Sequence, residues 1–299
     1  MTRVAINGFG RIGRSFLRIA IENPDIEIIA INDLASLDNL AYLLKHDSAY
    51  GLFKYPIEAS GNALRVGDKE IMFLSEKDPA GLPWDDMNID VVVESTGLFE
   101  DYEKANAHIT AGAKKVVISS PVKDAPDGGV AGATVLMGVN TDRLATCNIS
   151  ANASCTTNAA SPVVSIMEET LDITKAILNT IHGVTATQSL VDSPARKDFR
   201  KNRAGIANII PTTTGAAEAT TKAVKGIEFF DGISIRVPIL VGSIVDITFI
   251  SNRDTSVEEV NDIFRQASKE DRWKGIFTVT EEPLVSSDIV GNTHASIVD

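Results

Sequence analysis

One cysteine of this 299-residue chain lies where its thiol could be activated. Cys155 belongs to the run Ser154-Cys155-Thr156-Thr157-Asn158, at the predicted start of a helix. A helix N-terminus favours a thiolate, and a neighbouring imidazole lowers the pKa of a thiol further. His182 ends a predicted strand 27 positions later and could reach the thiol. A nucleophile and a base are the minimal set for covalent catalysis. The spacing alone leaves open that Cys155 is an inert core residue, as we expect for Cys147.

Two further features could bind an anion. Thr214 and Gly215 lie at the predicted start of another helix, where hydroxyl and N–H groups can face an anion. A simple N-cap is the alternative, and it needs only one threonine of the run Thr212-Thr213-Thr214. Arg236 lies within an apolar strand predicted over 233–239, so this cation needs a partner or a phosphate.

A glycine-rich run near the N-terminus matches a dinucleotide-binding fingerprint. Gly8, Gly10 and Gly13 follow a predicted strand and open a predicted helix, where backbone N–H groups can approach a pyrophosphate. Asp33 comes 20 positions after Gly13, at the end of the second strand, where a carboxylate binds ribose hydroxyls. A 2′-phosphate would be repelled there, so the pattern favours NAD over NADP.

The elements that must position these residues divide the chain at about residue 153. In residues 1–153, short apolar strands alternate with helical segments, which is typical of a doubly wound parallel sheet. The expected strands are 4–7, 26–31, 91–94 and 116–119, with helices over 12–20 and 101–111 and a hairpin over 64–73. Ser95, Thr96 and Gly97 follow one strand and Ser119 ends another, on the edge where such sheets bind ligands.

Residues 154–299 predict a different, α+β domain. A helix is expected over 155–171, followed by strands over 176–182, 233–239 and 243–251 that would form a mixed or antiparallel sheet. The long polar segment 185–208 between them is predicted to be functional. We therefore expect an α/β protein with a Rossmann-type nucleotide-binding domain (1–153) and a catalytic domain (154–299).

Composition excludes several classes of protein. The 28 Lys and Arg residues against 40 Asp and Glu residues give a net charge of −12, which disfavours nucleic acids and anionic membranes as partners. The sequence has no apolar run of about 18 residues and no secretory signal, which together with two cysteines favours the cytoplasm. His46, His108 and His294 show no zinc-type spacing, so no metal is expected, and His108 is placed on a polar helix.

Four collinear motifs resemble glyceraldehyde-3-phosphate dehydrogenase. They are residues 7–14, residues 154–158 together with His182, residues 208–217 and residues 236–238. The resemblance implies oxidation of D-glyceraldehyde 3-phosphate to 1,3-bisphosphoglycerate with NAD and inorganic phosphate, through a thiohemiacetal and a thioester on the cysteine. It also implies a homotetramer in which the 185–208 segment, the S-loop of the family, lies against a neighbouring subunit.

The resemblance assigns a role to each matching residue. Cys155 would be the nucleophile and His182 its base. Thr185 and Arg236 would bind the phosphate of the substrate. The attacking phosphate would be bound by Ser154, Thr156, Thr214 and Gly215. The cofactor would be bound by Gly8, Gly10, Arg11, Ile12, Gly13, Asp33, Ser95, Thr96, Gly97 and Ser119.

Three alternatives stay open at this point. The first is the related erythrose-4-phosphate dehydrogenase, and the second is a semialdehyde or acyl-phosphate reductase. The third is a catalytically impaired NAD-binding protein, because the sequence ends before the final strand and long helix expected from the family, so that weaker folding and weaker NAD binding are expected.

Overall fold

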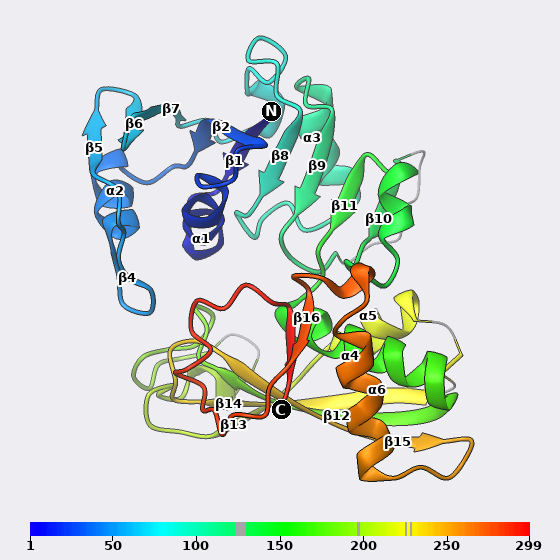
Figure 1. Cartoon of the computed structure of the whole chain (residues 1–299). Helices are drawn as coiled ribbons and strands as arrows, with labels where there is room; N and C mark the ends of the chain where they lie inside the picture. The colour runs from blue at the N-terminus through cyan, green and yellow to red at the C-terminus, as the bar shows by residue number, and fades with distance from the viewer. Residues whose placement is uncertain (123–129, 196–197, 225, 228) are drawn as a thin grey trace. The chain divides into compact units, whose positions relative to one another are not determined.

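Two compact units make up the part of the chain that the structure describes. The structure is a computed structural model that describes residues 1–122, 130–195, 198–224, 226–227 and 229–299 (Figure 1). Unit 1 comprises Met1–Val135 and Asp142–Ala153, and unit 2 comprises Leu136–Thr141 and Ser154–Asp299. The short segment Leu136–Thr141 thus belongs to unit 2, although the residues on both sides of it belong to unit 1.

Unit 1 is built on a nine-stranded sheet with the strand order β10-β11-β9-β8-β1-β2-β7-β6-β5. The strands are β1 (Thr2–Asn7), β2 (Ile26–Asn32), β5 (Ile57–Ser60), β6 (Ala63–Val66), β7 (Lys69–Leu74), β8 (Val91–Glu94), β9 (Lys115–Ile118), β10 (Gly132–Thr134) and β11 (Ile149–Ala151). All neighbours from β10 to β7 pair in parallel, and the hairpins β7-β6 and β6-β5 extend one edge antiparallel. The predicted doubly wound parallel sheet and the predicted hairpin are both confirmed.

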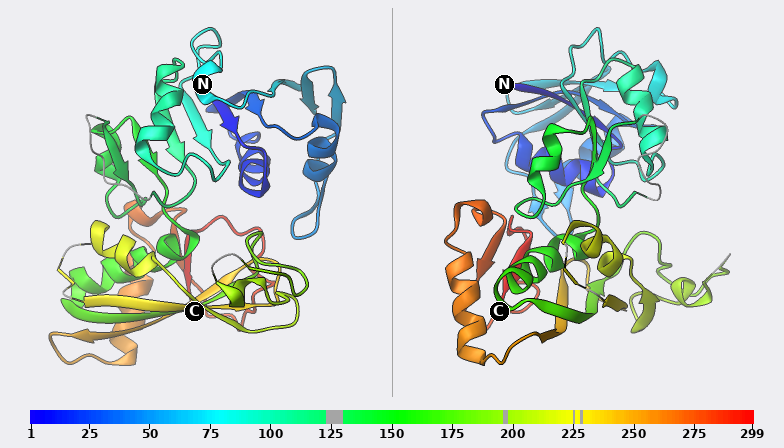
Figure 2. Two further views of the ribbon diagram at one scale, coloured as in Figure 1. Left: turned by 180° about the vertical axis from the view of Figure 1, so that it is seen from behind. Right: turned by 90° about the vertical axis from the view of Figure 1, so that its right-hand side faces the viewer.

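Helices cover both faces of this sheet because successive strand residues point to opposite sides. Val4 and Ile6 of β1 pack in one core cluster with Leu17 of α1 (Arg11–Ala20), whereas Ala5 packs in another with Trp84. Helices α1 and α3 (Tyr102–Thr110) lie on opposite faces of the sheet (Figures 1 and 2). The remaining elements of unit 1 are α2 (Leu37–Lys45), the short β3 (His46–Asp47) and β4 (Gly51–Leu52), and the 3₁₀ turns η1 (Pro79–Gly81) and η2 (Thr141–Ala145), whose first residue belongs to unit 2.

The recurrence of Ile12, Phe16, Ile19 and Ala20 at helical spacing predicts the apolar face of α1, and the structure agrees only in part. Ile12 and Ile19 are exposed, and the buried residues of the helix are Gly13, Leu17 and Ala20. A Cβ at Gly13 would lie only 2.2 Å from the carbonyl oxygen of Gly8. The helix therefore turns its small residue toward the end of β1, which a count of apolar residues does not reveal.

Unit 2 contains a four-stranded mixed sheet, which confirms the predicted mixed or antiparallel sheet and adds β13 to the three predicted strands. Its order is β13-β14-β12-β15, formed by β12 (Ile173–Gly183), β13 (Ile210–Thr213), β14 (Phe229–Val237) and β15 (Ser243–Ser251). Strand β12 runs parallel to β14 and antiparallel to β15. The unit also contains η3 (Phe199–Asn202), η4 (Asp271–Trp273) and the parallel pair β16 (Phe277–Val279) and β17 (Ser296–Val298).

One face of this sheet is covered by α4 (Cys155–Leu171), with α5 (Ala216–Ala223) and α6 (Val257–Ala267) completing the same core (Figures 1 and 2). Buried side chains of β12, such as Leu178, pack in one cluster with Val164 and Met167 of α4 and with Trp273. The segment between β12 and β13 lies at the opposite end of unit 2 from α6 (Figure 2). This packing fixes the N-terminus of α4 and the C-terminal end of β12 within one rigid core.

Candidate active site and dinucleotide-binding site

The thiol of Cys155 and the imidazole of His182 meet within unit 2. The Ser154 hydroxyl caps α4 by accepting a hydrogen bond from the N–H of Thr157 at 3.0 Å, so Cys155 is the first residue of the helix. His182 lies near the C-terminal end of β12. The Sγ of Cys155 is 3.2 Å from the Nε2 of His182, and Cys155 is an exposed, free cysteine. The predicted pair of nucleophile and base is therefore in hydrogen-bonding contact.

The surroundings of this pair favour a proton on the imidazole rather than on the thiol. Although Cys155 is exposed, the protein around it removes part of its water, which alone would raise the pKa of the thiol. The hydrogen bond and charge of His182, with the N–H of Thr156, outweigh that effect and lower the pKa below its ordinary value. The pKa of His182 is raised, chiefly by its hydrogen bond to Cys155. Both shifts stabilise a thiolate–imidazolium pair.

Arg236 joins this pair from the neighbouring strand. In the register of β12 and β14, Arg236 lies opposite His182. Its Nη1 lies 2.6 Å from the Nδ1 of His182 and donates to the carbonyl oxygen of Gly183 at 3.3 Å. Burial lowers the pKa of the guanidinium. Within the described residues Arg236 has no carboxylate partner: it contacts an imidazole and a carbonyl, and its charge opposes the shift that raises the pKa of His182.

The Nδ1 of His182 faces one donor and one acceptor. The carbonyl oxygen of Gly183 lies 2.6 Å from Nδ1, the same distance as the Arg236 guanidinium. A protonated Nδ1 donates to the carbonyl and, in a neutral ring, leaves Nε2 free to accept the thiol proton. A bare Nδ1 accepts from Arg236 and places the ring proton on Nε2, toward the sulfur.

The other predicted phosphate ligands make local hydrogen bonds. The hydroxyl oxygens of Thr185 and Thr187 are 2.9 Å apart, and the Thr214 hydroxyl accepts from the N–H of Ala216 at 3.1 Å. Gly215 is the N-cap of α5 and offers no side-chain cap. Thr156 is buried in the first turn of α4. The structure thus joins Cys155, His182 and Arg236 directly, while Thr185 and Thr214 bond to their sequence neighbours.

The glycine fingerprint of unit 1 forms a close turn between β1 and α1. Gly8 has a φ of +91°, and a Cβ there would lie 2.6 Å from the backbone nitrogen of Thr96. A Cβ at Gly10, by contrast, would meet nothing within 4 Å, and α1 starts there without a side-chain cap. The turn leaves open space at a helix N-terminus, which is where a pyrophosphate binds. The chain therefore fits a dinucleotide at this position.

The predicted acidic and hydroxyl ligands surround the same turn. The Asp33 carboxylate accepts from the N–H of Phe9 at 2.7 Å and from that of Ala35 at 2.9 Å. The Ser95 hydroxyl donates to the carbonyl oxygen of Gly8 at 2.7 Å, and the N–H of Ser119 donates to the carbonyl oxygen of Glu94 at 2.9 Å. The other predicted ligands here, Arg11, Ile12 and Gly97, are exposed, and Thr96 is half-buried.

Sequence reasoning missed a buried polar cluster beside these loops. His108, expected on a polar helix without a special role, is fully buried and contacts Trp84 and Glu94. Its partners are 24 and 14 positions away in the chain. The local signal was a histidine on α3, and only the tertiary fold reveals its partners.

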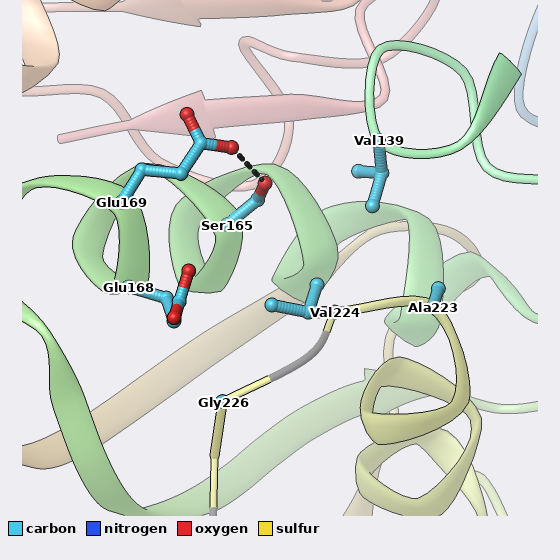
Figure 3. Close-up of a pocket in the computed structure, with 7 residues that line it drawn as sticks. All are labelled: Val139, Ser165, Glu168, Glu169, Ala223, Val224 and Gly226. Carbon is cyan, nitrogen blue, oxygen red and sulfur yellow. Dashed lines mark hydrogen bonds between the residues drawn. The ribbon is translucent and has the colours of Figure 1, made fainter. Parts of the chain in front are cut away.

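Figure 3 shows a surface pocket of about 340 Å³ in unit 2. It is lined by Val139, Ser165, Glu168, Glu169, Ala223, Val224 and Gly226. Glu168 and Glu169 lie near the C-terminal end of α4, whereas Cys155 begins that helix. At about 1.5 Å per residue, the two ends are roughly 20 Å apart. Among the described residues, no group of three metal-ligating side chains occurs, and no helix is long and apolar enough to span a membrane.

Comparison with known proteins defines this chain as an NAD-dependent oxidoreductase. Residues 2–102 match the NAD binding domain of glyceraldehyde 3-phosphate dehydrogenase, and residues 154–299 match the C-terminal domain of the same enzyme. The chain belongs to the glyceraldehyde-3-phosphate dehydrogenase family.

Individual relatives align along the whole chain. Glyceraldehyde-3-phosphate dehydrogenase of Thermotoga maritima is 47% identical over 303 residues, covering 100% of this chain and 89% of the relative. Glyceraldehyde-3-phosphate dehydrogenase 3 of Kluyveromyces marxianus is 42% identical over 301 residues, covering 100% and 88%. Glyceraldehyde-3-phosphate dehydrogenase 1 of Trichormus variabilis is 44% identical over 300 residues, covering 99% and 86%. The resemblance expected from the four motifs is confirmed.

Proposed function

We propose that this chain oxidises D-glyceraldehyde 3-phosphate to 1,3-bisphosphoglycerate with NAD and inorganic phosphate, using Cys155 as nucleophile and His182 as base. The observation that carries this proposal is the 3.2 Å contact between the Sγ of Cys155 and the Nε2 of His182. Both pKa shifts favour the thiolate, which is the nucleophilic form. An exposed sulfur at a helix N-terminus is also open to a substrate.

The chemistry runs through two covalent states of Cys155. The thiolate attacks the aldehyde carbon and forms a C–S bond, while the imidazolium of His182 gives its Nε2 proton to the carbonyl oxygen, which yields a thiohemiacetal and a neutral imidazole. His182 Nε2 takes the hydroxyl proton of this intermediate as a hydride leaves the same carbon. Bound NAD supplies the hydride acceptor. A phosphate oxygen then attacks the resulting thioester, the C–S bond breaks, and the acyl phosphate leaves with Cys155 restored as thiolate.

These reaction steps need two anion-binding subsites, and the chain offers donors for both. Arg236 and Thr185 bind the phosphate of the substrate, and the half-buried guanidinium beside His182 supports this assignment. The helix starts of α4 and α5 bind the attacking phosphate, with Ser154, Thr156, Thr214 and Gly215 as ligands. The N-cap Gly215 lacks a side-chain acceptor and the Thr214 hydroxyl takes only the N–H of Ala216, which leaves the next N–H groups of the first turn of α5 for an anion.

The cofactor is bound by unit 1 in this proposal. The space beside Gly10 and the N-terminus of α1 accept the pyrophosphate, and Asp33 accepts hydrogen bonds from the ribose hydroxyls. The remaining ligands are Gly8, Arg11, Ile12, Gly13, Ser95, Thr96, Gly97 and Ser119.

A homotetramer in the cytoplasm completes the proposal. The face of the unit 2 sheet opposite α4 exposes Ile177, Ile233, Ile244 and Ile250. Large apolar side chains exposed on one face are typical of a surface that is buried against a second copy of the chain. Sedimentation equilibrium of the full chain measures the assembly, and a monomer at micromolar concentration contradicts this part.

The assignment of Cys155 is tested by exchanging each cysteine in turn. Cys155→Ser should abolish phosphate-dependent NADH formation while NAD binding persists. Cys147→Ser is the matched control, because Cys147 is buried with Ala133 and Val135 in unit 1. Rates on glyceraldehyde 3-phosphate and erythrose 4-phosphate, each with and without inorganic phosphate, identify the aldehyde. Full activity of Cys155→Ser rules the mechanism out.

A further inference from the structure

A buried polar cluster lies in unit 1 beneath the loops that follow β1 and β8. We call Asn7, Asn32, Trp84, Glu94 and His108 the Glu94 cluster. Each of the five residues is at most 4% exposed. Burying this many polar side chains is costly unless every group is hydrogen-bonded, so the cluster requires an explanation. None of its members has a role in the mechanism above.

The indole of Trp84 fixes the proton on His108. The Nε1 of Trp84 donates to the Nδ1 of His108 at 3.0 Å. An indole N–H is a donor only, so Nδ1 carries no proton. The ring proton therefore lies on Nε2, which donates to the Oε2 of Glu94 at 3.1 Å. His108 is a neutral imidazole held in one tautomer.

Glu94 is the acceptor on which the whole cluster converges. Its Oε2 accepts from the Nδ2 of Asn7 at 2.5 Å as well as from His108. Its Oε1 accepts from the backbone N–H of Thr96 at 2.8 Å and from the Thr96 hydroxyl at 2.5 Å. The amide of Asn7 is oriented by Asn32, whose Nδ2 donates to its Oδ1 at 2.7 Å. Four donors facing one carboxyl group require an ionised carboxylate.

The carboxylate holds two loops that form the proposed dinucleotide site. Asn7 is the last residue of β1 and directly precedes Gly8, and Thr96 follows β8 by two residues. The backbones of Gly8 and Thr96 approach so closely that a Cβ at Gly8 would lie 2.6 Å from the Thr96 nitrogen. Displacing Thr96 or Asn7 therefore displaces the glycine turn.

We propose that Glu94, held by His108 and Trp84, is a positioning residue for the dinucleotide site. It acts through Thr96 and Asn7 and does not itself touch the cofactor. The inference rests on the proposed NAD binding by unit 1. Removing one donor from a buried carboxylate leaves that charge underpaired, and the loops then lose their fixed separation.

Three substitutions test this role in the full chain, with NAD as the titrated ligand. His108→Leu removes the donor to Glu94 and should weaken NAD binding about tenfold, the loss expected for an unsatisfied buried group. His108→Gln keeps an amide nitrogen near the position of Nε2 and should restore most of the affinity. Trp84→Phe leaves Nδ1 without its donor and should give an intermediate loss. In Trp84→Phe the donor from His108 to Glu94 is kept, so Glu94 has one more donor than in His108→Leu.

The control is Leu64→Ala on β6, a fully buried position in unit 1 that packs in a different hydrophobic cluster from Trp84. It should lower the melting temperature without a comparable loss of NAD affinity. Equal loss of affinity in Leu64→Ala and His108→Leu would show a general effect of instability and overturn the proposal. So would wild-type affinity in both His108→Gln and His108→Leu. If His108→Leu does not fold, the NAD affinities of Trp84→Phe and His108→Gln are compared instead. Weaker binding by Trp84→Phe supports the proposal, and equal affinities overturn it.

A spectroscopic measurement tests the proton arrangement independently of catalysis. Nitrogen NMR of labelled histidine should show a bare Nδ1 and a protonated Nε2 for His108, assigned by the signals lost in His108→Gln. A Nδ1-protonated or doubly protonated ring would overturn the inference. If the wild-type chain fails to bind NAD while His108 has the expected tautomer, the proposed function fails and not the buried arrangement.

Discussion

Replacing His182 by asparagine should remove the charge that holds Cys155 as a thiolate. The pKa of Cys155 is below its ordinary value because His182 outweighs the effect of partial burial, so His182→Asn should raise this pKa. The pair of thiolate and imidazolium exists between the lowered pKa of the thiol and the raised pKa of the imidazole. As pH falls through the lower of these two, the proton returns to sulfur. The variant should therefore need a higher pH to form the same thiolate population.

The distance between the two groups sets the size of the effect. At 3.2 Å, two unit charges attract by about 1.3 kcal/mol at the dielectric constant of water and by roughly 5 kcal/mol at an effective value near 20. Because Cys155 is exposed, solvent screens the pair and the lower figure applies more closely. About 1.4 kcal/mol corresponds to a factor of ten in population. We expect the thiolate population at neutral pH to fall roughly tenfold.

Alkylation by iodoacetamide measures this population without any turnover. The reaction rate of Cys155 should fall about tenfold at neutral pH in His182→Asn and converge with wild type at high pH. Both proteins carry Cys147→Ser, so that only one cysteine reacts. Identical pH profiles for the two proteins would refute the thiolate–imidazolium pair. A uniform decrease at every pH would instead show that the substitution only blocks access.

Three further changes test the two candidate sites. Asp33→Ala should weaken NAD binding about tenfold and improve NADP binding, because a carboxylate that accepts hydrogen bonds and repels phosphate is lost. Titration of the variant with both cofactors measures this change, and an unchanged preference for NAD over NADP contradicts it. Gly8→Ala should lower the free energy of unfolding by about 1–3 kcal/mol in denaturant titration, because the positive φ and the close Thr96 backbone both oppose a Cβ; wild-type stability contradicts the strained turn. Arg236→Lys should raise the KM for the aldehyde phosphate about tenfold with a smaller change in kcat, because a point charge replaces a planar fork of donors; an unchanged KM argues against phosphate binding by Arg236.

The sequence predicted those elements whose signals are local. Helix α4 begins at Cys155 and ends at Leu171 as expected, because Ser154 is a good N-cap and the apolar period continues to Leu171. Strand β15 likewise has the predicted bounds Ser243–Ser251. The pair of Cys155 and His182 could be anticipated because each residue lies at the end of such an element.

Contacts between distant strands could not be predicted in this way. Arg236 was expected to need a partner or a phosphate, and the sequence did not indicate that it would contact an imidazole and a carbonyl on the adjacent strand. That outcome depends on the register of β12 and β14, which no local pattern specifies. The burial of His108 depends in the same way on Trp84, which lies outside the helices and strands of unit 1.

The two histidines that contact catalytic or positioning groups differ in what faces Nδ1. Among the described residues, the Nδ1 of His108 faces the indole donor of Trp84 alone, so its tautomer is fixed and the ring serves as a static donor to Glu94. The Nδ1 of His182 faces both a carbonyl oxygen and the Arg236 guanidinium, so its ring can carry the proton on either nitrogen. If a bound phosphate draws Arg236 away from His182, the carbonyl oxygen of Gly183 remains the neighbour of Nδ1. This contact favours a proton on Nδ1 and a bare Nε2 that faces the sulfur. The same side chain is thus suited to proton transfer in one place and to rigid positioning in the other because of its neighbours alone.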